Sequence, residues 1–192
     1  MNTSTLHTAT EELAALLSEV THGDLGRLTP GPFKDVGDLY LYLNDQNIRV
    51  AISVANGQNS HSDPNDPIDR ADLGVPVGSE SAGLEVGYRQ TAQFMEAAFA
   101  SVTATSRLCR VDGLDEDIEV AALYEMQASN TVIHTWDIAQ ALGFSYCPEP
   151  EVAWRSLLAM VSRRAYSLDT SRASIDASDV FGCALRLAGR TP

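Results

Sequence analysis

The stretch DEDIEVAALYEMQASNTVIHTWDIAQALG, residues 115–143, decides the fold of this 192-residue chain. Acidic residues crowd its beginning, where negative charge meets the positive end of a helix dipole, and Gly143 suits a left-handed helix end. Between these signals, helical spacing places one stripe of side chains on a single face: Met126, Asn130, Ile133, His134, Asp137 and Ala141. The stretch therefore predicts a long helix whose stripe, apolar with three polar members, faces the interior.

Helix signals also dominate the remainder of the chain. Apolar residues recur at helical spacing soon after Thr10, a candidate N-cap, in the set Leu13, Leu16, Leu17 and Val20. Further helices are expected from the cap Asp35 to about Asn56, from about Leu84 to Val102, and from Pro150 onward. A short last helix is expected to begin at Asp176 or Ser178 and to end at Gly189.

These helices predict an all-α fold: a four-helix bundle with additional C-terminal helices, in a single domain over residues 1–192. Residues 106–111 are the one candidate for a short extended piece. Residues 57–81 are rich in Asn, Ser, Asp and Pro and predict a long loop. Such a loop either covers a pocket or is a flexible connection, and the sequence leaves both open.

Composition narrows the class of protein. The chain has 26 acidic against 13 basic residues, and a net charge of −13 argues against nucleic acid and anionic membranes as partners. It has no apolar run of about 18 residues, the length of a membrane span, and no signal-peptide pattern, so we expect a cytoplasmic protein. Without a CxxC pair, the three cysteines are expected to be small buried or half-buried residues: Cys109, Cys147 and Cys183.

The polar members of the stripe are the main functional candidates. An inward polar group without a hydrogen bond costs about 1–3 kcal/mol, so Asn130, His134 and Asp137 must find partners. One interpretation is a satisfied core network in which His134 bonds to Asp137 or to a backbone carbonyl and Asn130 bridges helices. The other is a site in which His134 transfers protons and Asp137 fixes its tautomer.

Three segments carry a family resemblance. Residues 134–143, HTWDIAQALG, resemble the HxWDxAxAxG signature of the DinB-like, mycothiol-dependent maleylpyruvate isomerase family. Residues 24–32, DLGRLTPGP, followed by VGDL at 36–39, are similar to a second family stretch, and residues 184–192, ALRLAGRTP, to a third. The resemblance implies a bundle with a pocket in its core, usually holding a divalent metal, and mycothiol as the thiol co-substrate.

The metal ligands that the family implies are mostly replaced. Tyr42 stands where the family has a histidine, Asn130 where it has an acidic residue, and Gly31 where it has a cysteine; only His134 matches. A phenol and a neutral amide are poor ligands for zinc or nickel, so we expect no bound metal. Asp45 or Asp137 could serve as substitute ligands, which keeps a zinc or nickel site, used with mycothiol, as an alternative.

These residues predict a metal-independent enzyme for a small organic substrate, of isomerase, cyclase or lyase type. His134 is then the general acid and base, Tyr42 donates to a developing oxyanion, Asn130 orients the substrate, and Asp137 orients His134. A role in specialised metabolism fits a divergent copy, and the near-absence of lysine is typical of a GC-rich, actinobacterial genome. The alternatives are a metal- and mycothiol-dependent S-transferase or isomerase, and a non-catalytic small-molecule-binding or scaffold protein that forms a homodimer.

Two further expectations concern other residue types. Arg186 and Arg190 are expected to pair with surface carboxylates rather than to anchor an anionic ligand. Trp136 and Trp154 are expected to pack in the core.

Overall fold

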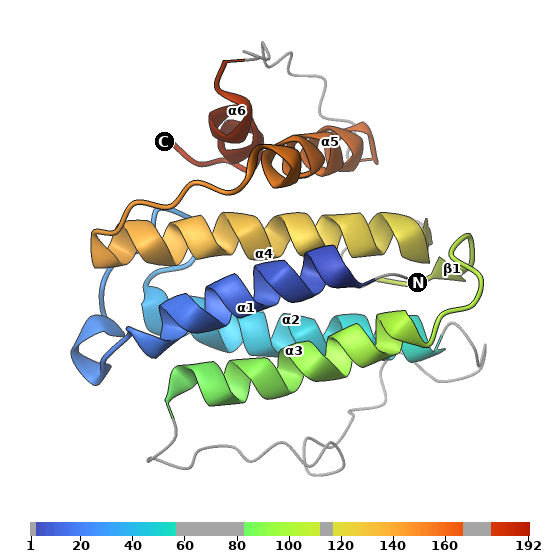
Figure 1. Cartoon of the computed structure of the whole chain (residues 1–192), viewed down its shortest axis with the longest axis horizontal. Helices are drawn as coiled ribbons and strands as arrows, with labels where there is room; N and C mark the ends of the chain where they lie inside the picture. Colours follow the sequence, from blue (N-terminus) through green and yellow to red (C-terminus); the bar gives the residue numbers. More distant parts are fainter. Residues whose placement is uncertain (1–2, 57–82, 112–116, 167–177) are drawn as a thin grey trace.

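The computed structural model describes residues 3–56, 83–111, 117–166 and 178–192 (Figure 1). In these ranges the chain is mostly helical, which confirms the all-α class. The elements are α1 (Ser4–Ser18), a 3-10 turn η1 (His22–Asp24), α2 (Val36–Asn56), α3 (Leu84–Ala100), β1 (Leu108–Cys109), β2 (Ile118–Glu119), α4 (Val120–Leu142), α5 (Pro150–Tyr166) and α6 (Val180–Leu187). β1 lies within the short extended piece expected at 106–111, and it pairs antiparallel with β2, a strand that the sequence did not predict. The predicted loop 57–81 lies outside the described residues.

Three helix ends lie where their capping residues place them. The side chain of Asp35 accepts a hydrogen bond from the backbone N–H of Asp38 at 2.9 Å, at the start of α2. Gly143 has φ of 80° after α4, and Gly189 has φ of 81° after α6, both in the left-handed region that glycine adopts without strain. These ends follow from local chemistry and were predictable for that reason.

Three predicted helix starts are wrong. α4 begins at Val120 and not among the acidic residues before it, because Ile118 and Glu119 pair with β1 as strand β2. α1 begins at Ser4, and Thr10 lies buried within it, because Leu6 extends the apolar stripe toward the N-terminus. The cap of α6 is Asp179, whose side chain accepts a hydrogen bond from the N–H of Gly182 at 3.0 Å, and not Ser178. Asp176, the other candidate, lies outside the described residues.

Helices α1 to α4 pack side by side, and α5 and α6 cover the outer side of α4 (Figure 1). α1 packs against α3 and α4, and α2 packs against the same two helices. α2 and α3 run in the same direction, so the end of α2 and the start of α3 lie at opposite ends of the bundle (Figure 1). This arrangement places α4 between the bundle and the added helices.

A polar layer divides the bundle core into two apolar clusters. One cluster includes Phe99 and Val54, and the other includes Leu13 and Leu39. Between them, the Asn47 amide donates to Thr91 Oγ1 at 3.1 Å and accepts from Gln127 at 3.3 Å. The three side chains come from three helices and are all buried. Because their donors and acceptors must meet, this layer fixes the relative register of α2, α3 and α4.

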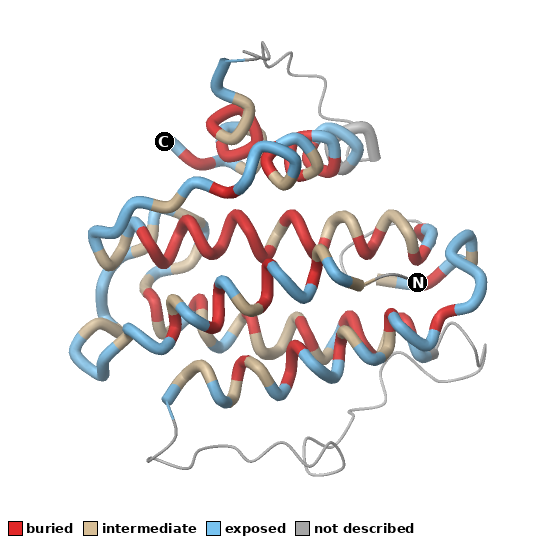
Figure 2. The backbone as a smooth tube through the Cα atoms, in the orientation of Figure 1, coloured by how far each residue is buried: buried red, intermediate tan, exposed pale blue. Residues whose placement is uncertain are grey.

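α4 is buried far more completely than a single inward stripe predicts. Every residue from 131 to 139 is buried, because α5 and α6 cover the side of α4 that faces away from the bundle (Figure 2). Trp136 lies in this second interface, in contact with Met160 and Leu185. His134 and Asp137 therefore lie in the most enclosed part of the chain that the structure describes.

Two residues expected in the interior lie at the surface instead. Trp154 is 45% exposed, because it points away from the α4–α5 interface, and Cys147 is exposed in the connection before α5. Cys109 and Cys183 are buried, as expected. Among the described helices, none combines the length and the apolar character that crossing a membrane requires.

Candidate functional site

The site is built around two side chains of α4, His134 and Asp137. His134 Nδ1 lies 3.0 Å from Asp137 Oδ2, and the two side chains are only 8% and 0% exposed. A carboxylate oxygen can only accept, so Nδ1 carries the hydrogen of this bond, and in a neutral imidazole Nε2 is then the nitrogen with the lone pair. The expected contact between these two residues is therefore present in the structure.

Arg190 is the second partner of Asp137. Its guanidinium donates from Nε to Oδ1 at 3.1 Å and from Nη2 to Oδ2 at 2.6 Å, while Nη1 donates to the carbonyl of Ala188 at 2.6 Å. Arg190 is 8% exposed, so the expectation that it pairs with a surface carboxylate is wrong. Arg186 does form such a pair, with Asp179 at 3.0 Å.

The charge state of Asp137 follows from these contacts. Burial raises the pKa of the Asp137 carboxyl, but the hydrogen bonds from His134 and Arg190 outweigh burial and hold that pKa below its usual range. Asp137 is therefore a carboxylate at neutral pH. The centre of the site is thus the buried Asp137 carboxylate. Arg190 donates to both of its oxygens, and His134 donates to one of them.

Gly31 closes the site from the loop that precedes α2. A Cβ atom on Gly31 would lie 2.9 Å from both Arg190 Nη2 and Asp137 Oδ2. A glycine at this position therefore lets the loop backbone pack directly on the ion pair. Gly31, Asp137 and Arg190 come from the three separate segments that resemble the DinB-like family, and the fold brings one residue of each together.

Gly31→Ala is expected to lower the free energy of unfolding by about 1–3 kcal/mol, because the added methyl group displaces two groups that hold each other in place. Urea unfolding followed by circular dichroism measures the change. Gly26→Ala, in the same loop region, is the control, since a Cβ there meets nothing within 4 Å. Equal stability of the two variants would show that the loop does not rest on the ion pair.

Two aromatic rings lie against His134. The Tyr42 ring from α2 and the Phe33 ring from the loop each have their centroid 5.6 Å from that of His134, in edge-to-face geometry. Phe33 and Tyr42 also contact each other, with centroids 4.4 Å apart, and both are half-buried. The structure thus brings the predicted residue Tyr42 to His134, and it adds Phe33, which follows the TPGP segment and which sequence reasoning missed.

Asn130 and Asp45 hold less central positions. Asn130 is half-buried one helical turn before His134, and its side chain makes no hydrogen bond within the described part of the chain, so the expected bridge between helices is absent there. Asp45 lies 2.6 Å from Arg49 on the same helix. Within the described ranges, no group of three His, Cys, Asp or Glu side chains could hold a metal ion.

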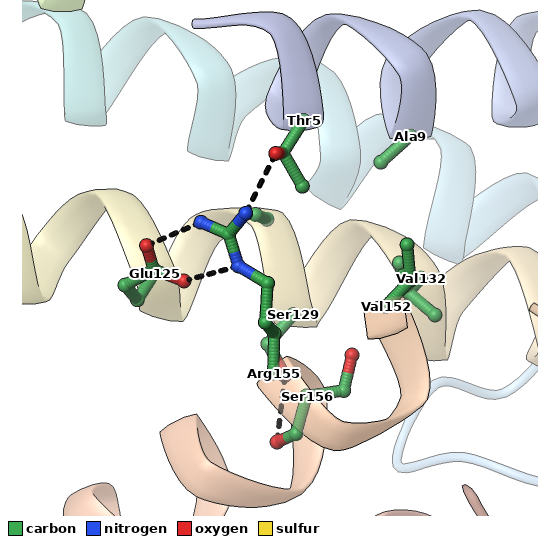
Figure 3. A pocket seen from close by; sticks show the side chains of 9 residues that line it. Thr5, Ala9, Glu125, Ser129, Val132, Val152, Arg155 and Ser156 are labelled. Atoms are coloured by element: carbon green, nitrogen blue, oxygen red, sulfur yellow. Dashed lines mark hydrogen bonds and ion pairs between the residues drawn. The ribbon is translucent and has the colours of Figure 1, made fainter. Parts of the chain in front are cut away.

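A separate hollow lies where α1, α4 and α5 meet (Figure 3). Arg155 spans it, with its guanidinium bound to both oxygens of Glu125 and to the hydroxyl of Thr5. The volume of the hollow is about 10 Å³, which is room for about one water molecule. We therefore assign this hollow to the attachment of α5 and not to a substrate.

Comparison of the chain with protein-family models, with curated protein sequences and with solved structures gives no match.

Proposed function

We propose that this chain is a metal-independent enzyme that moves a proton on a small organic molecule, in an isomerase, cyclase or lyase reaction. The observation that carries the proposal is the buried chain of contacts from Arg190 through Asp137 to His134. A histidine whose Nδ1 is held by a carboxylate has one defined tautomer and a second nitrogen oriented for proton transfer.

In the proposed reaction, His134 Nε2 removes a proton from a carbon atom next to a carbonyl group of the substrate. The electron pair of the broken C–H bond moves into the carbonyl, and the Tyr42 hydroxyl donates a hydrogen bond to the oxyanion that develops there. The imidazolium then returns the proton to another atom of the same molecule, so that no further reactant is required. Asp137 stabilises the imidazolium between these two steps.

Access to His134 runs past the aromatic rings. His134 itself is 6% exposed, whereas Phe33 and Tyr42 are each partly exposed and contact its ring. We propose that a substrate reaches His134 by taking the place of the Phe33 ring, since that ring is held by packing contacts on a loop. An uncharged, flat substrate suits this position, because the donors of Arg190 are already engaged by Asp137 and Ala188.

The fold belongs to the same proposal. We infer that α1 to α4 form a DinB-like bundle with α5 and α6 as additions. The support is that three segments similar to that family occur in the family's order and meet at Gly31, Asp137 and Arg190. Two features of the site disfavour a bound cation. Tyr42 and Asn130 stand where the family implies metal ligands, and the Arg190 guanidinium already neutralises Asp137.

Hydrogen–deuterium exchange on candidate substrates tests this function. The untagged protein is incubated in D2O with a panel of small flat ketones and unsaturated carbonyl compounds, and NMR follows the loss of the α-proton signal. We expect exchange above the buffer rate for at least one compound, and the same rate with a chelator present. Exchange that stops with chelator and returns with zinc or nickel would support the metal-dependent alternative. No exchange across the panel would favour a non-catalytic binding protein.

A further inference from the structure

The segment that follows α6 brings one cation into the interior. After α6, the left-handed Gly189 turns the chain, and the backbone N–H of Arg190 donates to the carbonyl of Leu185 at 2.9 Å. Arg190 is buried, whereas Gly189, Thr191 and Pro192 around it are exposed. The turn therefore directs this one side chain toward α4.

Arg190 could pair with a carboxylate at the surface and keep its hydration, as Arg186 does, so its burial requires an explanation. The chain has twice as many acidic as basic residues, and Arg186 on the same segment pairs with a surface carboxylate, Asp179. A buried ion pair gives little net stability compared with apolar side chains of similar size, because both charges lose their hydration. The placement of Arg190 thus suggests a role for its charge beyond holding α6 in place.

The charge acts on a shared oxygen. Asp137 Oδ2 accepts from Arg190 Nη2 at 2.6 Å and from His134 Nδ1 at 3.0 Å, so the guanidinium lies one hydrogen-bond acceptor away from the imidazole. A cation at this distance lowers the proton affinity of both groups through Coulomb repulsion of the added proton. The Tyr42 side chain from α2, a phenol, also contacts the His134 ring.

We infer that Arg190 is a positioning residue that keeps Asp137 ionised and His134 neutral, with the imidazole proton on Nδ1. In the absence of this guanidinium, the buried Asp137–His134 pair would bind an additional proton near neutral pH, and His134 could no longer accept one from a substrate. The inference rests on the proposed function in one respect, namely that His134 accepts a proton from a substrate. The charge state of the pair can be measured without any substrate, so the two can fail independently.

Titration of His134 in Arg190→Gln tests the inference. The imidazole signals of His134 are followed by NMR from acid to neutral pH in the variant and in the unaltered protein. We expect the proton affinity of the Asp137–His134 pair to rise about tenfold or more when the guanidinium is removed. Arg190→Lys, which keeps the cation but loses the two-point contact, is expected to give a smaller rise.

Arg186→Gln is the matched control, because it removes one positive charge from the same segment at an exposed position four residues away. The titration of His134 is expected to stay unchanged in this variant. An equal shift in both variants would indicate a general charge effect and would overturn the inference, as would an unshifted titration in Arg190→Gln.

If Arg190→Gln does not fold at neutral pH, the pH dependence of its stability provides a second test. A proton on the Asp137–His134 pair replaces the missing positive charge, so we expect this variant to regain stability relative to the unaltered protein as the pH falls to about 5. A variant that lacks only packing contacts would show the same deficit at both pH values, and that result would contradict the inference.

Discussion

His134→Gln is expected to lower the rate of proton exchange, in any substrate that the unaltered protein acts on, by about 10²–10⁴-fold. Glutamine retains an N–H that can donate to Asp137, so the buried carboxylate keeps a partner and the helical content should not change. What the variant loses is a group that accepts and returns a proton at neutral pH. The exchange rate measured by NMR, together with far-ultraviolet circular dichroism, separates loss of chemistry from loss of folding.

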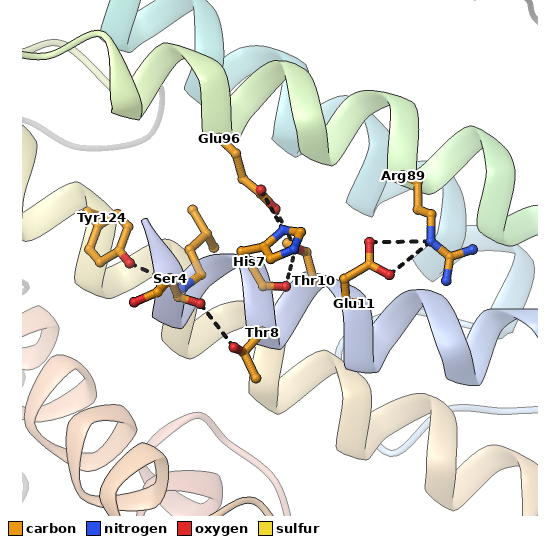
Figure 4. Close-up of polar contacts among 9 residues, drawn as sticks. Ser4, His7, Thr8, Thr10, Glu11, Arg89, Glu96 and Tyr124 are labelled. Atoms are coloured by element: carbon orange, nitrogen blue, oxygen red, sulfur yellow. Dashed lines mark hydrogen bonds and ion pairs between the residues drawn. The ribbon is translucent and has the colours of Figure 1, made fainter. Parts of the chain in front are cut away.

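His7→Gln is the matched control for this experiment. His7 on α1 also has its Nδ1 on a carboxylate, Glu96 Oε2 at 2.9 Å, and that carboxylate also accepts from Thr10 (Figure 4). The side chain of His7 is 59% exposed and lies outside the His134 site. Exchange is expected to continue at the unaltered rate in His7→Gln. An undiminished rate in His134→Gln would remove His134 from the mechanism.

Asp137→Ala is expected to have the largest effect on stability, a loss of about 3–5 kcal/mol in the free energy of unfolding. The variant leaves the Arg190 guanidinium buried without its carboxylate and takes the partner from His134 Nδ1. Urea unfolding monitored by circular dichroism gives the value. Glu11→Ala, which removes the partly exposed partner of Arg89, should change stability little because that pair is solvated. Similar losses in the two variants would contradict the assignment of Asp137 as the anchor of the site.

The pH dependence of this effect has a defined direction. The folded-state pKa of Asp137 lies below that of an aspartate in an unfolded chain, which is about 3.9. The stability that the carboxylate contributes is therefore fully present above that value and is lost as the pH falls through the folded-state pKa. The difference in stability between the unaltered protein and Asp137→Asn should accordingly shrink in strong acid.

The elements that the sequence predicts well are those with local causes. The end of α4 is recognisable from Gly143 and the start of α2 from the cap Asp35, because capping involves residues only a few positions apart. His134 and Asp137 are separated by three residues on one helix, so their contact also follows from helical periodicity. The sequence predicts too late a start for α1, because Leu6 joins the core only through packing against other helices.

The rest of the site depends on tertiary structure. Arg190 is 53 residues from Asp137, and although Gly189 predicts a turn before Arg190, that local signal does not show which residue Arg190 contacts. Phe33 reaches His134 only because the loop before α2 folds onto α4. The single signal for these contacts was that the segments containing Gly31 and Arg190 both resemble one family, and a resemblance does not state which residues touch.

The most direct test of the central claim is the tautomer of His134 in the unaltered protein, read from the two imidazole ¹⁵N chemical shifts at neutral pH. The claim is that Asp137, ionised by Arg190, holds the proton of a neutral imidazole on Nδ1 and leaves Nε2 to exchange protons. We therefore predict a protonated Nδ1 and an unprotonated Nε2. A hydrogen on Nε2 with a bare Nδ1 would contradict the account, because His134 would then have no hydrogen bond to give to Asp137.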